Sequence, residues 1–240
     1  MIKRFLKKVF GWLFSKKKPT LPPADVFDQP KKEDDNISPS PAGGGAIVKG
    51  DPIWLWATLY YLPGMKSDRD GVALKDMKGN ELGPKLSQSK FCNLAMQGSG
   101  VIDGKVYGFQ GTTGNHQTVC DYKPSGRVRF HEDPNKYGTG VMNLPLTPYK
   151  SIAVDKRIIP YGSKIYIPSA VGTEYKFEGK TLVHDGIFFA QDTGGLIKGN
   201  HIDVYIGPVE GGLKAAINAN PFDFVKSNED SIFEAYILKE

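Results

Sequence analysis

Two aspartates in one short stretch are the first candidates for chemistry. Asp192 and Asp203 stand eleven residues apart in AQDTGGLIKGNHIDVYIG, on either side of a double glycine. If HIDVYI is a strand, alternation sends Ile202, Val204 and Ile206 to a core and Asp203 to the opposite face. A carboxyl group held there can give and take a proton, and burial or a second carboxylate raises its pKa towards neutrality.

A third aspartate shares this setting. Asp155 ends an apolar run in SIAVDKRIIPYGSKIYIP just before a turn, and Asp192 ends FFAQD just before Gly194 and Gly195. The double glycine permits positive φ angles and the close approach of a ligand, so we expect a positive φ at one of the two. For each aspartate alone, the structural alternative is that it accepts hydrogen bonds from turn amides.

Other familiar chemistries leave no motif in the sequence. The chain has no H-E-x-x-H, no G-x-S-x-G and no phosphate-binding glycine loop before a helix-forming stretch. The four histidines lack metal-ligand spacing: His116, His131, His184 and His201. We therefore expect neither a metal ion nor a cofactor.

The body of the chain, residues 51–240, consists of short apolar runs separated by turn residues. The runs expected to form strands are 54–62, 91–96, 106–110, 164–168, 174–178 and 233–238. Such spacing favours a barrel or sandwich over a helical bundle. One short helix is expected at 209–219. Cys92 and Cys120 allow one disulfide in an oxidising compartment, with two buried thiols as the alternative.

The beginning of the chain differs from this body in composition. Residues 1–18 hold seven Lys or Arg and no acid, with apolar residues at helical spacing. They are predicted to form a basic amphipathic helix on an anionic membrane surface, with a secretory signal or a solubilising tail as alternatives. Residues 19–50 are predicted to be a flexible, disordered linker. The rest of the chain carries 24 bases against 26 acids, so we expect no nucleic-acid partner.

Several motifs in one order resemble a known family. Residues 149–207 resemble the 3D domain, named for three aspartates, with Asp155, Asp192 and Asp203 at their positions. The segments SIAVDKRIIPYGS, QDTGGLIKG and HIDVYIG, with ATLYYLP and MQGSGVIDG upstream, are similar to the MltA family of membrane-bound lytic murein transglycosylases, which cut peptidoglycan.

This resemblance implies a mainly β fold. The expected architecture is a double-psi β-barrel with a smaller β domain inserted at about 95–148 and a glycan groove between the two. The insert is short for the family. The family's N-terminal lipid anchor has no match here, so the basic helix and linker are expected to take its place.

The resemblance also assigns roles to the residues at matching positions. Asp203 takes the place of the single catalytic acid, with Asp192 as a supporting carboxylate. The residues expected to contact the glycan are Thr58, Tyr60, Gln97, Gly98, Ser99, Asp155, Gly194, Gly195, Lys198 and His201. Four tyrosines are candidates for stacking on sugar rings, or else fill the core: Tyr60, Tyr61, Tyr107 and Tyr205.

The implied reaction needs one carboxyl group, because the C6 hydroxyl of the substrate itself attacks C1. The acid protonates the oxygen of the MurNAc–GlcNAc β-1,4 bond and then, as a carboxylate, deprotonates that hydroxyl, which yields 1,6-anhydromuramic acid. Three alternatives stay open: a non-catalytic peptidoglycan-binding module, a glycan hydrolase in which Asp155 or Asp192 activates water, and a structural barrel at a membrane surface. The expected location is the cell envelope, on its periplasmic side.

Overall fold

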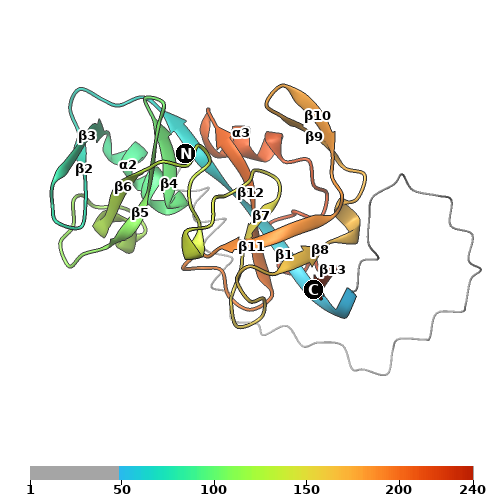
Figure 1. Ribbon diagram of the computed structural model, residues 1–240. Coiled ribbons are helices and arrows are strands. Elements are labelled where there is room, and N and C mark those ends of the chain that lie inside the picture. The colour runs from blue at the N-terminus through green and yellow to red at the C-terminus, as the bar shows by residue number, and fades with distance from the viewer. Residues whose placement is uncertain (1–48, 240) are drawn as a thin grey trace, which may run out of the picture. The chain divides into compact units, whose positions relative to one another are not determined.

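The computed structural model describes residues 49–239, which form mainly β-strands (Figure 1). The predicted helix at 1–18 and nearly all of the predicted linker lie outside the described residues. Within residues 49–239, no helix is both long enough and apolar enough to span a membrane.

Six strands close into a ring. They are β1 (Lys49–Met65), β7 (Ser151–Ala153), β8 (Lys164–Tyr166), β11 (Ile187–Asp192), β12 (His201–Val209) and β13 (Phe233–Leu238). Each pairs with the next in the order β12, β7, β11, β8, β13, β1, and β1 pairs back onto β12. The mainly β class is thereby confirmed, and the ring is a closed barrel. Its double-psi connectivity stays a prediction.

The strands of the ring share one apolar cluster. Ile202, Val204 and Ile206 of β12 are buried in it, together with Leu55 and Ala57 of β1. The alternation expected for HIDVYI is therefore confirmed. Fully burying an aliphatic side chain of this kind contributes about 1.5–3 kcal/mol, which fixes the register of β12, because a slip by one residue would move the whole set out of this cluster.

A second apolar cluster lies in the chain between β1 and β7. Its elements are β2 (Val72–Lys75), β3 (Glu81–Leu86), α2 (Gln88–Gln97), β4 (Ser99–Ile102), β5 (Lys105–Thr112), the 3₁₀ turn η2 (Lys123–Arg127) and β6 (Val128–Asp133). The far end of β1 pairs in parallel with β4, so β1 runs from the barrel into this group (Figure 1). The cluster already includes Leu74 and Leu86, upstream of the insert expected at about 95–148.

The run 91–96, expected to be a strand, is helical, so this prediction was wrong. The buried residues of α2 are Phe91, Leu94 and Ala95, which is helical spacing. Gly98, with a φ of 83°, ends the helix in a conformation that favours glycine. A short apolar run has no period of its own, and the polar residues before it, which extend the helix to Gln88, decide the outcome.

The remaining elements belong neither to the six strands of the ring nor to the group between β1 and β7. They are the 3₁₀ turns η3 (Val141–Asn143) and η4 (Pro168–Ala170), the hairpin β9 (Glu174–Phe177) with β10 (Lys180–Val183), and α3 (Gly212–Ala219). The helix expected at 209–219 is confirmed by α3, although β12 continues to Val209 before it begins.

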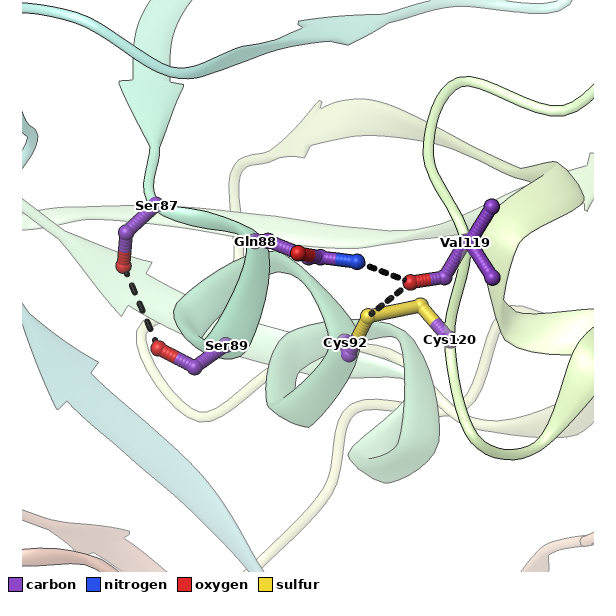
Figure 2. Close-up of a disulfide and its surroundings, with 6 residues drawn as sticks. All are labelled: Ser87, Gln88, Ser89, Cys92, Val119 and Cys120. Carbon is purple, nitrogen blue, oxygen red and sulfur yellow. Dashed lines mark hydrogen bonds between the residues drawn. A yellow bond between two sulfur atoms is a disulfide. The ribbon is translucent and has the colours of Figure 1, made fainter.

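Cys92 and Cys120 form a disulfide, which settles the alternative left open by the sequence (Figure 2). The disulfide joins α2 to the loop before η2. The side chain of Gln88 also donates a hydrogen bond from α2 to the Val119 carbonyl of this loop (Figure 2). Because Cys120 belongs to the second cluster, the disulfide fixes the position of α2 against that core.

Candidate functional site

The strand β7 brings the two aspartates together. Asp203 of β12 pairs with Ala153 in antiparallel register, and Asp192 of β11 pairs with the same alanine in parallel register. The two carboxylates therefore flank one short strand. Strand pairing places neighbouring residues about 5 Å apart on each side, so only the methyl group of Ala153 stands between the two side chains.

Asp203 is held by a threonine of the neighbouring strand. Thr58 of β1 is in register with it and donates a hydrogen bond of 2.8 Å to its Oδ1. Burial raises the pKa of Asp203 to about 7, and the charge of Asp192 adds to this effect while the Thr58 bond opposes it. Asp203 still has intermediate exposure, so it is shielded from most water yet remains reachable.

Asp192 has partners on both carboxylate oxygens. Tyr60 donates to Oδ2 and the backbone N–H of Thr193 donates to Oδ1, each at 2.8 Å. Burial raises the pKa of Asp192 to about 6, against the lowering effect of these two bonds. The pKa of Tyr60 is raised well above its ordinary value by burial and by Asp192, so the phenol stays a donor.

One oxygen of the pair accepts no hydrogen bond from residues 49–239. Both oxygens of Asp192 and Oδ1 of Asp203 accept hydrogen bonds, whereas Oδ2 of Asp203 has no partner among the described residues. This oxygen keeps some contact with solvent, since it is not among the fully buried unpartnered atoms of the described chain. The arrangement therefore offers one carboxyl oxygen, with a pKa near neutrality, to a ligand.

His201 is buried beside this pair, with 5% of its surface exposed. Its Nε2 lies 2.8 Å from Oγ1 of Thr58, and its ring stacks on Trp56, with centroids 3.6 Å apart and planes 3° from parallel. Burial lowers its pKa to about 4, so the ring is neutral at neutral pH. The expected direct contact of His201 with glycan stays untested, but its ring nitrogen faces protein.

Asp155, the third aspartate, is 7% exposed and fully engaged by the protein. Arg157 pairs with both of its oxygens, and the backbone N–H of Gly199 donates to Oδ2 at 2.9 Å. These bonds hold the pKa of Asp155 well below its ordinary value, with Arg157 as the largest cause. Asp155 thereby ties the loop between β11 and β12 to the segment after β7.

The expected positive φ at Gly194 or Gly195 was wrong. Neither glycine is left-handed, and in this loop the positive φ, 61°, belongs to Gly199. Gly194 instead provides close approach, because a Cβ there would lie 2.8 Å from Cγ1 of Ile197, whereas a Cβ on Gly195 would meet nothing. The physical need at Gly194 is room for a buried isoleucine, not an unusual backbone angle.

The other predicted contact residues lie on either side of the pair. Gln97, at the end of α2, accepts a bond of 3.2 Å from the backbone N–H of Tyr61, which fixes it beside β1. Gly98 ends α2 and Ser99 begins β4. Lys198 is exposed in the loop between β11 and β12. Direct contact of these residues with a glycan stays a prediction.

Three of the four candidate stacking tyrosines are core residues. Tyr61, Tyr107 and Tyr205 are at most 2% exposed, so their rings are not available to a sugar. The Tyr205 hydroxyl donates to the carbonyl of Tyr137 at 2.8 Å, which satisfies the buried phenol. Tyr60 keeps intermediate exposure and acts through its hydroxyl on Asp192.

Sequence reasoning missed two residues of the site, Trp56 and Arg157. Arg157 follows Asp155 by two positions, so a local signal was present. Trp56 lies on the same face of β1 as Thr58 and Tyr60, a period-two signal that also was present. The described residues contain no group of three or more His, Cys, Asp or Glu arranged to hold a metal ion.

Comparisons with known proteins identify one matching domain family and one curated relative. Residues 150–216 match the 3D domain family. A membrane-bound lytic murein transglycosylase A homolog of Buchnera aphidicola subsp. Schizaphis graminum is 36% identical over 85 residues, which is 33% of this chain and 22% of that protein. The chain thus spans under a quarter of this curated relative.

Among solved structures, E. coli MltA with bound chitohexaose is 20% identical, with a TM-score of 0.53 over 78% of this chain and 72% of that one. This likeness concerns the fold. The family match covers all three aspartates, whereas Thr58 and Tyr60 lie outside it. The chain contains a 3D domain and is MltA-like in its fold and in part of its sequence.

Proposed function

We propose that the protein is a peptidoglycan lytic transglycosylase in which Asp203 acts first as the acid and then as the base. The observation that carries this proposal is the pair of carboxyl groups flanking Ala153, in which Oδ2 of Asp203 is the one oxygen that no group within residues 49–239 binds. A group that must donate and then accept a proton works best with a pKa near the working pH, and burial gives Asp203 a pKa of about 7.

In this mechanism Asp203 protonates the oxygen between MurNAc and GlcNAc, and the C1–O bond breaks. The C6 hydroxyl of the MurNAc ring then bonds to C1, and its proton passes to the Asp203 carboxylate, which restores the acid. Asp192, fixed by Tyr60 and the Thr193 N–H, supplies a neighbouring negative charge that keeps the proton on Asp203 and stabilises positive charge developing at C1.

Two findings support a glycan substrate. The similar E. coli protein was solved with chitohexaose, a chain of β-1,4-linked GlcNAc that resembles a peptidoglycan strand. The curated relative is named as a murein transglycosylase homolog. For this chain, Asp155 is better assigned to holding the loop between β11 and β12 than to contacting sugar or activating water, because Arg157 and Gly199 occupy its oxygens.

Mass spectrometry of a peptidoglycan digest tests the function. The transglycosylase mechanism gives muropeptides that end in 1,6-anhydromuramic acid, one water lighter than the products of hydrolysis. Hydrated reducing ends would assign the protein to the hydrolases. Glycan binding without product would assign it to the non-catalytic binding modules.

The proposed location is the periplasmic side of the cell envelope. The disulfide between Cys92 and Cys120 supports an oxidising compartment of this kind. Residues 1–18 are proposed to bind the membrane surface, because their seven basic residues would face anionic lipid.

Removing residues 1–48 is expected to lower co-sedimentation with vesicles that contain anionic lipid, while product formation from soluble glycan strands stays unchanged. Each basic residue near such a surface contributes about 1 kcal/mol, so raised salt should release the full-length chain as well. Equal vesicle binding by the full-length and shortened proteins would contradict the surface role.

The Asp192→Asn substitution is expected to move the alkaline limb of the kcat/KM profile to lower pH. The reason is that the charge of Asp192 raises the pKa of Asp203, so removing that charge lets Asp203 lose its proton at a lower pH. In the unaltered protein this limb is expected near the Asp203 pKa of about 7. Asp223→Asn, which changes a fully exposed carboxylate, is the matched control and should leave the limb in place. An unmoved limb in Asp192→Asn would show that the two carboxylates do not interact.

A further inference from the structure

The Thr58 hydroxyl faces two groups at once. Its Oγ1 lies 2.8 Å from Oδ1 of Asp203 and 2.8 Å from Nε2 of His201. A hydroxyl has one hydrogen, so it can donate to only one of the two and must accept from the other. The position of this one hydrogen therefore sets the direction of both hydrogen bonds.

Thr58 donates its hydrogen to Asp203 rather than to His201. When Asp203 is ionised, a hydrogen bond to its carboxylate is about twice as strong as one between neutral groups, and burial keeps the His201 ring neutral. When Asp203 is protonated on Oδ2, its Oδ1 is a carbonyl oxygen that can only accept, so Thr58 remains its donor. If Thr58 donates to Asp203, its oxygen accepts from His201, which must then carry its proton on Nε2. The rival tautomer, which would donate to the backbone carbonyl of Leu196, would turn the Thr58 hydrogen away from Asp203.

The His201 ring is fixed by its surroundings. Trp56 is in register with His201 on the parallel strand pair β1–β12, and the two rings stack with planes 3° from parallel. This stack fixes the plane of the imidazole, and the contact with Thr58 places Nε2 on the edge that faces the hydroxyl. Thr58 and Asp203 come next in the same register, two residues along each strand, so the three side chains and Asp203 lie on one face.

We propose that Trp56, His201 and Thr58 form a positioning relay that keeps one hydrogen bond on Oδ1 of Asp203 and thereby places the exchanged proton on Oδ2. An oxygen that already accepts a donor is the poorer place for the acid proton, so the proton occupies the oxygen that is open to substrate. None of the three needs to touch the sugar. This inference rests on the proposed role of Asp203 and assigns Thr58 and His201 to its support.

The relay makes two spectroscopic predictions that do not depend on activity. The ¹⁵N shifts of His201 are expected to show the proton on Nε2 at neutral pH. Thr58→Val, which keeps the shape but removes the donor, is expected to raise the carboxyl pKa of Asp203, because the Thr58 bond lowers it. The other titratable groups facing Asp203 are Asp192 of β11, Tyr60 of β1 and His201 of β12.

Kinetics of the same variants separate a relay from a structural role. Thr58→Val is expected to lower kcat about tenfold with little change in KM and to move the alkaline limb to higher pH, and Thr58→Ser should restore both. His201→Phe keeps the stack on Trp56 but removes Nε2, so it should lower kcat in the natural background and have no further effect in Thr58→Val. Thr181→Val, at an exposed site on β10, is the control.

Two results would overturn the relay: a His201 proton on Nδ1, or losses from Thr58→Val and His201→Phe that simply multiply. Absence of anhydro products from the unaltered protein would instead remove the proposed function. In that case the ¹⁵N spectra and the Asp203 titration would still decide whether Thr58 and His201 act as one unit.

Discussion

Replacing Asp203 by Asn is expected to reduce product formation from purified peptidoglycan by about 10² to 10⁴, which is the usual contribution of general acid–base catalysis. Asn keeps the shape of the side chain and can still accept from Thr58, but it has no proton to give and take. Both proton transfers of the proposed reaction would be lost together. Release of muropeptides from insoluble peptidoglycan, followed over time, measures the effect.

The Asp203→Asn protein should remain folded and still bind glycan. The raised pKa of Asp203 means that its ionised form is costly in the fold, so stability is lost as the pH rises through about 7. The Asn variant has no such charge and should be at least as stable above this pH. Thermal unfolding and co-sedimentation with peptidoglycan check both points. Full activity in a folded Asp203→Asn protein would exclude Asp203 as the acid.

Reducing the disulfide is expected to lower the free energy of unfolding by about 3–4 kcal/mol. Cys92 and Cys120 lie 28 residues apart, and a crosslink of this span restricts the unfolded chain by about that amount. The second cluster should lose stability first, because Cys120 is part of it and α2 packs against it. Urea unfolding with and without reductant measures the difference.

The double substitution Cys92→Ser and Cys120→Ser is the control for this experiment. It should show the reduced stability at once and respond no further to reductant. An oxidised and a reduced protein that unfold at the same urea concentration would show that the crosslink adds nothing to the packing of α2.

The mainly β class and the placement of Asp203 away from the apolar face could be predicted because their signals are local. Alternation along HIDVYI separates Ile202 and Val204 from Asp203 without any knowledge of the partner strands. The turn residues between runs show where strands end. That Asp192 supports Asp203 was an expectation from the resemblance, and their shared pairing with Ala153 was not predicted, because strand order and register cannot be read from one segment.

The features that could not be predicted depend on residues far apart in the sequence, or on small differences in free energy between two local conformations. The contact of Thr58 with His201 joins residues 143 positions apart, and the stack of Trp56 follows from the same parallel register. The run at 91–96 became helical because the residues before it completed a helix against the second core. Gly194 was placed in the wrong conformation because a tight space and a positive φ both favour glycine, and sequence alone does not separate the two.

Digestion of peptidoglycan in water enriched in heavy oxygen tests the central claim most directly. If the C6 hydroxyl of the substrate attacks C1 while Asp203 transfers the protons, the new muramic ends are anhydro sugars that contain no oxygen from the solvent. The account predicts unlabelled anhydro products from the unaltered protein and none above background from Asp203→Asn. Products that carry heavy oxygen at a reducing end would contradict it and make water the nucleophile.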